Sequence, residues 1–488
     1  MSLTVKRNKF RFYPDPKRII TRFYKPSDDE RVEMIIKNIL NLSEEETYLV
    51  LDQILKNFSK RHRNISKILE KNYNEIKGVI ENLKGGYSLI SLKKKLLIGA
   101  YFTQEYSIES AAFFNPSIVL DPDQLNLEEG QTRVIISFRA TGEGHISSIV
   151  FRSAIIDKDN NISVVKPGNL VDVPETIKRY VYDKKQFKKK FEEIEHDGDV
   201  LNKVIDGLND KFIYGELMGR TVEVLKKEKL SEYDKAEINR IKWFATSHYE
   251  TTFSLDTALS ERVIFPVSYS ETNGIEDARF VRFTDDNGKI TYYATYTAYN
   301  GRTILSTLLE TKDFYNFKIE PLNGEYTINK GMALFPRKIN GKYAMISRYD
   351  GYANYIMFSD NLNIWQTAKK IQEPSFPWEF TKVGNAGSPI ETEKGWLLIT
   401  HSVGPMRRYS LGAILLDLED PSKVIARLEE PLLTPNEDER DGYVPNIVYS
   451  CGSIILNGEL IIPYAISDYA STFATISMNE LFDEMVFE

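Results

Sequence analysis

Residues 286–301 read Asp-Asn-Gly-Lys-Ile-Thr-Tyr-Tyr-Ala-Thr-Tyr-Thr-Ala-Tyr-Asn-Gly. Two Asn-Gly pairs enclose a short run rich in β-branched and aromatic residues, which is typical of a strand between two tight turns. Similar runs occur at 132–138 and 146–156, and further Asn-Gly pairs begin at residues 273, 323, 340 and 457. From residue 100 onward the sequence therefore predicts a mainly β fold made of successive hairpins.

The spacing of these hairpins favours one β architecture. A sandwich or a barrel would also fit a series of hairpins. However, strand pairs recur at roughly 45–60 residues, near the period of a four-stranded propeller blade. Once one insertion is set aside, residues 100–488 have room for about five such units. We therefore expect a five-bladed β-propeller catalytic domain over 100–488.

Two regions have helical rather than β patterning. Residues 1–99 form a predicted N-terminal helical region, with helices expected over 31–42, 43–59 and 64–83. Ser43 and Glu46 have the spacing of a capping box at the start of the second helix. A helical insertion is expected at about 175–245, where the many lysines and glutamates indicate a solvated helix face. These helical regions pack against the main body or against a second subunit, so a homo-oligomer is one expected assembly.

Composition argues against several classes of protein. A formal net charge of −7 is unlike the basic surface of a nucleic-acid binder. A single cysteine, Cys451, rules out an intrachain disulfide framework and suits a reducing compartment. The N-terminus lacks the apolar stretch of a signal peptide, and no apolar run is long enough to span a bilayer. We predict a cytoplasmic protein with no nucleic-acid or membrane partner.

The chemistry-bearing residues are mostly acids. The 5 histidines have no metal-ligand spacing, and no nucleotide-binding loop or nucleophile elbow is present, so we expect no metal and no cofactor. Acids lie beside predicted turns, where a propeller places its loops, and turns also favour acids for conformational reasons alone. Cleavage of a glycosidic bond requires such acids, because one must protonate the leaving oxygen. The candidates are Glu143, Glu276, Asp277, Asp441 and Asp468.

Ten short segments match a known family in its own order. They are 114–117, 136–140, 274–280, 296–301, 330–336, 341–348, 395–401, 412–421, 444–448 and 464–468. Through them the chain from residue 113 to about 478 resembles glycoside hydrolase family 130, which comprises mannoside phosphorylases and β-mannosidases. The resemblance implies a five-bladed propeller with the sugar site at the mouth of its central channel.

The same resemblance implies inverting cleavage of a β-mannoside. Asp277 matches the general acid, which delivers its proton through a hydroxyl of the mannosyl unit. The positions that line the sugar or phosphate site correspond to Asn115, Arg139, Tyr299, Lys330, Arg348, His401 and Asp468. Arginine suits phosphate or vicinal hydroxyls, and an aspartate accepts from two sugar hydroxyls.

Four departures from the phosphorylase pattern bear on the attacking group. Ser148 and Ser347 stand where phosphorylases carry an arginine and often a histidine, Ala278 replaces a proline, and Asn300 replaces an aspartate. Phosphate needs several charged donors, and losing two of them weakens its pocket.

Glu143 lies in the same loop as Ser148 and is the candidate base that activates a water, while His145 and Arg152 are candidates to restore positive charge. We therefore expect a glycosidase that uses water on short manno-oligosaccharides. The alternatives are a phosphorylase that takes inorganic phosphate as co-substrate and releases mannose 1-phosphate, and a non-catalytic carbohydrate-binding propeller.

Overall fold

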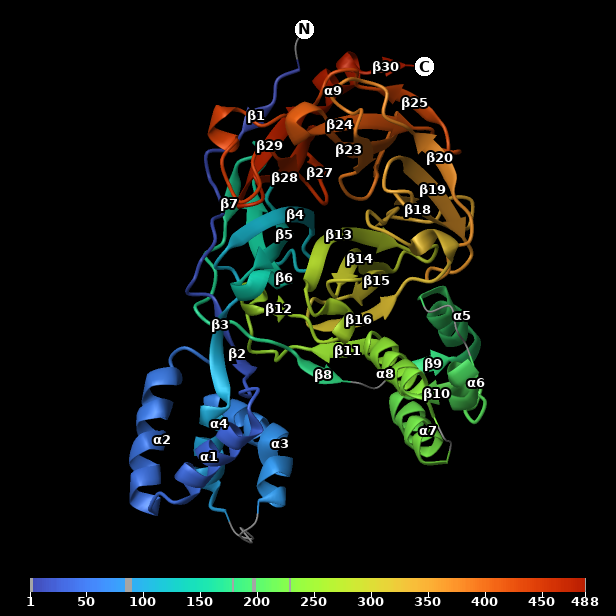
Figure 1. The fold of residues 1–488 in the computed structure, drawn as a ribbon. Coiled ribbons are helices and arrows are strands. Elements are labelled where there is room, and N and C mark those ends of the chain that lie inside the picture. The colour runs from blue at the N-terminus through green and yellow to red at the C-terminus, as the bar shows by residue number, and fades with distance from the viewer. Residues whose placement is uncertain (1–2, 84–89, 178–179, 195–198, 228–229, 488) are drawn as a thin grey trace.

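The protein is mainly β, with helices in its N-terminal region, in one insertion and, as the short α9 (Met478–Glu484), near residue 480 (Figure 1). The computed structural model describes residues 3–83, 90–177, 180–194, 199–227 and 230–487. Five antiparallel sheets follow one another along the chain, and each is built mostly of consecutive strands. The predicted mainly β class is confirmed.

The strands of the five sheets have the following bounds. The first sheet contains β4 (Ala112–Leu120), β5 (Thr132–Thr141), β6 (Ser147–Ile156), β7 (Ile162–Val164) and β12 (Val263–Ile264). The second contains β8 (Glu175–Ile177), β11 (Tyr249–Thr252), β13 (Gly274–Thr284), β14 (Ile290–Tyr299), β15 (Ile304–Thr311) and β16 (Asn316–Pro321). The third contains β17 (Ala333–Leu334), β18 (Tyr343–Ser347), β19 (Asn354–Ser359) and β20 (Lys369–Gln372).

The last two sheets contain most of the strands after residue 380. The fourth contains β21 (Lys382–Asn385), β22 (Ile390–Thr392), β23 (Gly395–Val403), β24 (Tyr409–Leu416), β25 (Val424–Arg427) and β30 (Val486–Phe487). The fifth contains β1 (Lys6–Arg7), β26 (Val448–Tyr449), β27 (Ile454–Leu456), β28 (Glu459–Ile466) and β29 (Ala470–Ser477). Because β1 pairs with β29, both ends of the chain contribute to one sheet.

Neighbouring sheets contact one another in chain order. Contacts join β4 to β13, β14 to β17, β18 to β21 and β24 to β26, and β28 of the fifth sheet returns to β4 of the first. Figure 1 shows the sheets side by side in this order. A cavity of about 430 Å³ is lined by residues from the first, second, fourth and fifth sheets and from the segment after β17, among them Leu120, Arg282, Arg337, Glu391 and Ile454. The number of blades stays a prediction, which we take up under the proposed function.

Three of the four N-terminal helices were predicted. They are α1 (Asp29–Leu40), α2 (Glu44–Phe58) and α3 (Ile65–Asn82), and the capping box of Ser43 and Glu46 is present with both of its hydrogen bonds. The fourth helix, α4 (Leu92–Tyr101), was not expected. The region connects to the sheets through β2 (Ile19–Phe23) and β3 (Thr103–Ser107), which pair with each other.

The insertion forms a small core of its own. It contains β9 (Val181–Asp183), α5 (Lys184–Ile194), α6 (Asp199–Ile205), β10 (Lys211–Ile213), α7 (Tyr214–Lys227) and α8 (Glu232–Thr246). The helical patterning was read correctly, but the hairpin of β9 and β10 was missed because each strand has only 3 residues. Phe191, Leu201 and Ile241 are fully buried, so the charged residues surround an apolar centre.

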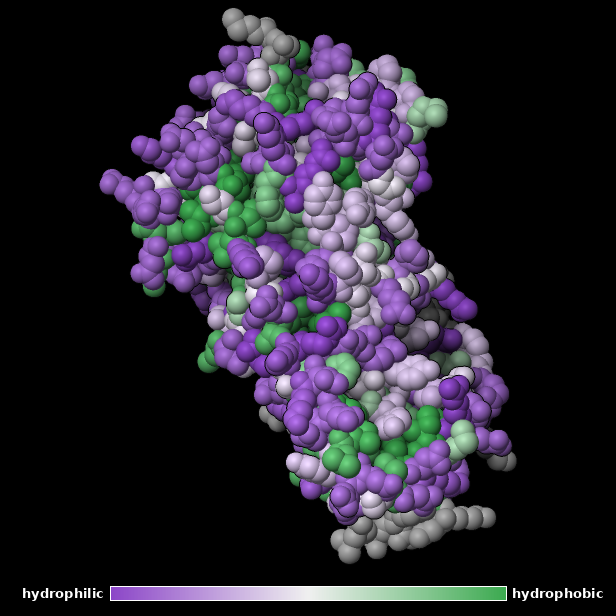
Figure 2. All heavy atoms as spheres, turned by 90° about the vertical axis from the view of Figure 1, so that its left-hand side faces the viewer, coloured by the Kyte–Doolittle hydropathy of each residue, from purple (hydrophilic) through white to green (hydrophobic). Residues whose placement is uncertain are grey.

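The outer surface mixes polar and apolar side chains. Figure 2 shows hydrophobic side chains gathered over the N-terminal helical region, where Leu49 and Leu92 are exposed. In the described ranges no helix is both long and apolar enough to cross a membrane. Self-association through the helical regions and a cytoplasmic location both stay predictions.

Gly99 allows α4 to lie against α3. A Cβ at Gly99 would lie 1.8 Å from the Leu69 carbonyl oxygen, whereas a Cβ at Gly78 of α3 meets nothing within 4 Å. We expect Gly99→Ala to destabilise the helical region by about 1–3 kcal/mol because the helices must separate. Gly78→Ala should instead stabilise it by about 0.5–1 kcal/mol. Amide hydrogen exchange of α3 and α4 measures both effects, and equal protection in the two variants would contradict the close packing.

Candidate functional site

Matching β-bulges on β4 and β13 shape the site. The register of β13 against β14 shifts between Glu276 and Arg279, and that of β4 against β5 shifts between Phe114 and Ser117. The bulged residues Asp277 and Asn115 have φ angles of 56° and 49°. This left-handed region is tolerated best by glycine, asparagine and aspartate. The residue types at 115 and 277 therefore suit the backbone that the bulges need.

Asp277 belongs to a compact group of charges. Arg139 contacts Glu276 at 3.0 Å through Nη2 and Asp277 Oδ1 at 3.4 Å through Nη1. Asn115 Nδ2 donates to Asp277 Oδ1 at 2.6 Å. Lys330 Nζ contacts the second oxygen of Glu276. Two cations and two carboxylates thus meet where the first and second sheets and the segment before β17 come together.

Tyr299 lies beside this group. The Lys330 ammonium sits 5.9 Å from the centre of the Tyr299 ring, at the end of β14. The ring is partly exposed, so an aromatic face borders the charges. An aromatic face next to hydrogen-bonding groups is a common arrangement in small-molecule sites.

A second group contains Arg348 and His401. His401 Nδ1 lies 2.8 Å from the Asn385 carbonyl oxygen and therefore donates to it, so Nε2 accepts from Arg348 Nη1 at 2.8 Å. Burial, and then the positive charge of Arg348, hold the pKa of His401 well below its ordinary value. His401 is therefore a neutral acceptor that orients Arg348.

Arg279 connects the two groups. Its Nη1 donates to the Asp277 carbonyl oxygen at 3.0 Å, and its Nε donates to Asn385 Oδ1 at 3.1 Å. Its Nη2 donates to the Tyr449 hydroxyl at 2.8 Å. One buried guanidinium therefore joins the second, fourth and fifth sheets. Arg279 and Asn385 were not among the predicted site residues, although Arg279 lies in the segment that was matched.

Asp468 interacts electrostatically with Asp277 and Arg139. It lies in the turn between β28 and β29 with a φ of 49°. Burial raises the pKa of Asp468 to about 7, and the negative charge of Asp277 adds to this rise while Arg139 and Arg407 oppose it. Burial alone would also raise the pKa of Asp277, but Arg139, Arg279 and Lys330 hold it below its ordinary value. The two aspartates therefore hold their protons very differently at neutral pH.

Glu143 lies apart from these contacts. It is exposed in a 3₁₀ turn over Glu143–His145, and its carbonyl oxygen accepts from the Tyr106 hydroxyl. Within the described ranges, no hydrogen bond or ion pair joins its side chain to Asp277 or Arg139. The predicted role of Glu143 as a base gains no support from these contacts.

The residues expected to restore positive charge have other partners. Arg152 is buried against Glu109 at 2.7 Å, and His145 Nδ1 lies 3.0 Å from the Tyr443 hydroxyl. The hydroxyls of Ser148 and Ser347 are buried, and neither has a hydrogen-bond partner in the described part of the chain. Among the described residues no group of three or more His, Cys, Asp or Glu side chains could hold a metal ion.

Comparisons with known proteins identify the family. The model of glycoside hydrolase family 130, described as beta-1,4-mannooligosaccharide phosphorylase, matches residues 251–486. A 1,2-beta-oligomannan phosphorylase of Thermoanaerobacter sp. (strain X514) is 37% identical over 229 residues, which are 46% of this chain and 75% of the relative. A beta-1,2-mannobiose phosphorylase of the same organism is 42% identical over 202 residues, or 41% of this chain and 65% of the relative.

One solved structure aligns with part of the chain. The beta-1,2-mannobiose phosphorylase from Listeria innocua in complex with beta-1,2-mannobiose aligns with a TM-score of 0.46 and 20% identity. The alignment covers 78% of this chain and 92% of that one. From the sequence matches, the chain belongs to glycoside hydrolase family 130, and it is a glycoside-processing enzyme.

The raised pKa of Asp468 predicts a pH-dependent stability. Between pH 4 and about 7 the folded chain holds a proton on Asp468 that the unfolded chain has lost. Its contribution to the free energy of unfolding therefore falls as the pH rises through this window. We expect Asp468→Asn to remove this decline and to be more stable than the parent at pH 8 by roughly 1–4 kcal/mol.

Urea denaturation at pH 5 and pH 8 measures the difference. Asp159→Asn, on the exposed turn after β6, serves as the matched control and should follow the parent at both pH values. An Asp468→Asn variant whose stability still declines by the parent's full amount would contradict the raised pKa.

Proposed function

We propose that the chain is an inverting β-mannoside phosphorylase that transfers a mannosyl unit from a short β-mannoside to inorganic phosphate. The observation that carries the proposal is the set of cations around Asp277, namely Arg139, Arg279 and Lys330. Arg348 adds a fourth cation in the adjoining group, and its Nε is buried without a partner among the described residues. Phosphate requires several charged donors, and this site supplies them.

We further propose that the five sheets are the blades of a propeller and that residues 100–488 form the catalytic domain. The contacts that lead from each sheet to the next and back to the first support this reading. Asn115 and Asp277 lie near the starts of β4 and β13, whereas Leu120 and Arg282, at the far ends of these strands, line the cavity of about 430 Å³ described above. The site and this cavity would then lie at opposite mouths of one central channel.

The proposed reaction uses the side chains as follows. A phosphate oxygen, held by Arg139, Lys330 and Arg348, attacks the anomeric carbon from the face opposite the leaving group. The bond from this carbon to the glycosidic oxygen breaks, and the electron pair stays on the leaving oxygen. Asp277 supplies the proton for that oxygen, directly or through a mannosyl hydroxyl. The products are α-mannose 1-phosphate and a sugar one unit shorter.

The charges around Asp277 link its proton to phosphate binding. A proton donor must be protonated when the substrate reacts, yet Arg139 and its neighbouring cations hold the pKa of Asp277 low. A bound phosphate would neutralise these cations and thereby raise the pKa of Asp277. In this proposal the acid becomes competent when the attacking anion is in place. Water brings no such charge.

Hydrolysis is the second candidate function, and the sequence favoured it. It rested on Ser148, Ser347 and Glu143. The exposed position of Glu143 and the phosphorylase activities named for the matched relatives weigh against it. A non-catalytic sugar-binding propeller remains the third reading. The relatives' names also suggest β-1,2-linked mannosides as the first substrates to test.

Dependence on phosphate separates the candidates. We expect cleavage of β-1,2-mannobiose only when inorganic phosphate is present, with α-mannose 1-phosphate seen by ³¹P NMR. The β-1,3- and β-1,4-linked mannobioses are tested in parallel to define the linkage. Free mannose formed at the same rate without phosphate would sink the phosphorylase proposal and establish a hydrolase.

Removing the proposed acid should abolish the chemistry. Asp277→Asn keeps the size of the side chain but cannot donate the required proton, so we expect kcat to fall by about 10²–10⁴. Asp286→Asn is the matched control, because Asp286 is 64% exposed and forms an ion pair with Lys338. Unchanged turnover in Asp277→Asn would favour another acid, and an absence of turnover in the parent with every sugar tested would favour the binding protein.

A further inference from the structure

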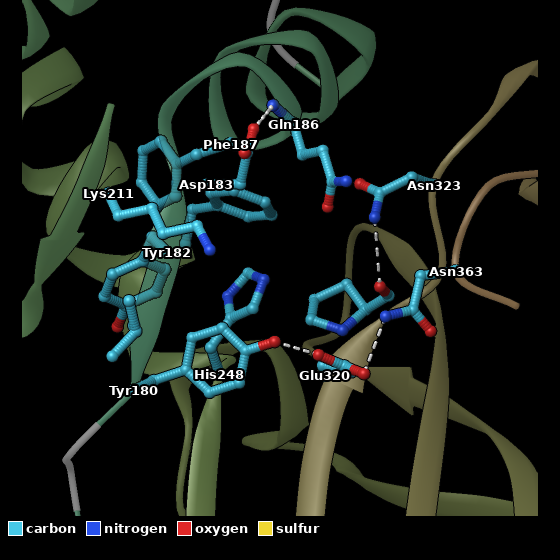
Figure 3. A pocket seen from close by; sticks show the side chains of 13 residues that line it. Tyr180, Tyr182, Asp183, Gln186, Phe187, Lys211, His248, Glu320, Asn323 and Asn363 are labelled. Atoms are coloured by element: carbon cyan, nitrogen blue, oxygen red, sulfur yellow. Dashed lines mark hydrogen bonds between the residues drawn. The ribbon is translucent and has the colours of Figure 1, made fainter. Parts of the chain in front are cut away.

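A second pocket lies at the junction of the insertion with the second and third sheets (Figure 3). Its volume is about 340 Å³, near the lower end of the roughly 300–1,000 Å³ usual for ligand sites. Tyr180, Gln186 and Lys211 come from the insertion, while Glu320 ends β16 and Asn363 lies between β19 and β20. With Phe244 and His248 at the end of the insertion, five segments that are separate in sequence meet around one space.

Aromatic rings form one wall of the pocket. The rings of Tyr180, Tyr182 and Phe244 lie with their centres 5.1, 5.2 and 5.3 Å from the imidazole of His248. Figure 3 shows Tyr180 and His248 beside the open space. Such a wall offers apolar ring faces to a ligand, while the hydroxyls of Tyr180 and Tyr182 are held by Glu320 and by the Ala245 carbonyl oxygen.

The opposite wall carries hydrogen-bonding groups. Glu320 is buried, accepts from the Tyr180 hydroxyl and accepts from Asn363 Nδ2 at 2.7 Å. Figure 3 shows the amides of Gln186 and Asn323 facing each other at the rim. Among the described residues, the Asn323 amide makes one long contact, 3.5 Å from Nδ2 to the Pro321 carbonyl oxygen. The amides of Gln186 and Asn323 are therefore placed to serve a ligand.

Two buried polar atoms in the pocket lack partners. His248 Nδ1 and Asn363 Oδ1 are both buried, and neither has a hydrogen-bond partner within the described ranges. A buried polar atom without a partner costs about 1–3 kcal/mol, so proteins rarely keep such an atom without a reason. A ligand hydroxyl in the pocket would satisfy His248 Nδ1, whereas the Asn363 oxygen points away from the open space (Figure 3).

The charges around the pocket nearly balance. Lys318 Nζ contacts Glu320 at 3.2 Å, and Lys211 and Asp183 are both exposed at the rim. Burial lowers the pKa of His248 to about 4, so the imidazole is neutral at neutral pH. The pocket therefore favours neither an anion nor a cation. A neutral ligand rich in hydroxyls fits it best.

We propose that this pocket is a second carbohydrate-binding site, which holds one or two neutral sugar units of an oligosaccharide against the Tyr180 and His248 wall. Aromatic faces and side-chain amides are the groups that recognise the apolar faces and the hydroxyls of a sugar ring. The site is separate from the one at Asp277, because it is built from the insertion, β16 and the segment before β20. The choice of a β-mannoside as the first probe rests on the proposed function.

The pocket adjoins the chain segment that leads to Lys330. Asn323 follows β16, and Lys190 of α5 donates to Thr327 Oγ1 at 3.1 Å, three residues before Lys330. A sugar held at this pocket therefore lies beside the segment that carries one cation of the proposed phosphate site. An oligosaccharide chain bound here would be kept close to the enzyme without occupying the Asp277 site.

Calorimetry with β-1,2-mannobiose tests the proposal on the full chain. The Asp277→Asn variant is used without phosphate so that the sugar is not consumed. We expect two binding sites per chain. When Gln186→Ala and Asn323→Ala are added to this variant, the affinity of the pocket for the sugar should fall at least about tenfold, because two hydrogen-bonding amides are lost. Lys189→Ala is the matched control, since Lys189 is exposed on the same helix and does not line the pocket.

A structural readout and an activity readout complete the experiment. Crystals of the parent soaked in mannobiose should show sugar density against His248 and Asn363, and the double variant should retain the parent's kcat on mannobiose within about twofold. The proposal is overturned if the double variant binds sugar in the pocket as tightly as the Lys189→Ala control does. It is also overturned if crystals show sugar only at Asp277, or if the pocket binds inorganic phosphate instead. Sugar bound in the pocket of a chain that cleaves no mannoside would refute the proposed function alone.

Discussion

The site depends on one guanidinium being held by two consecutive carboxylates. Consecutive residues of a regular strand point to opposite faces of the sheet, so Glu276 and Asp277 should not reach the same partner. The bulge in β13 removes this restriction, because Asp277 adopts a left-handed backbone and shifts the register by one residue. Arg139 then contacts both side chains. Without the bulge, the proposed acid would lose its strongest neighbouring charge.

A parallel bulge on β4 supports the first one. Asn115 occupies it in the same backbone conformation and donates to the Asp277 carboxylate, and the following Pro116 has no amide hydrogen to lose from the ladder. Asp277 is therefore fixed from two strands. Its surroundings are strongly cationic, while nearby Asp468 keeps its proton to about pH 7. Two carboxylates whose pKa values are pushed apart in this way usually take different roles in a site, one as the acid and the other as the anion.

Much of the fold was readable from the sequence, and the reasons are local. The capping box at Ser43 and the apolar spacing of 31–42 marked helices because each signal lies within one or two turns. Runs bounded by Asn-Gly marked β14 for the same reason. The short strands β9 and β10 carried too little periodicity to be seen. The ring of sheet contacts depends on pairings between distant segments, which a hairpin pattern suggests but does not specify.

The site was only partly readable. Ordered motifs led to Asp277 and to the residues that gather around it, but the bridges made by Arg279 to Asn385 and Tyr449 need tertiary structure. The prediction of hydrolysis has less support from the structure than the prediction of the Asp277 site, because it treated Glu143 and Ser148 as neighbours in one loop. The left-handed Gly144 and His145 turn the loop so that Glu143 is exposed while Ser148 is buried.

The insertion, which lies outside the family match, contacts the segment that leads to Lys330 of the proposed site. The match begins at residue 251, after the insertion ends, and it also leaves out Asn115 and Arg139 on the first sheet. The proposed site is therefore assembled from a matched part that carries Asp277 and Lys330 and from an unmatched part that positions them. Because α5 contacts Thr327, the insertion constrains the segment before Lys330 directly. Differences in substrate preference between this chain and its relatives are thus expected to arise at that junction, because the insertion lies outside the family match and contacts the segment before Lys330.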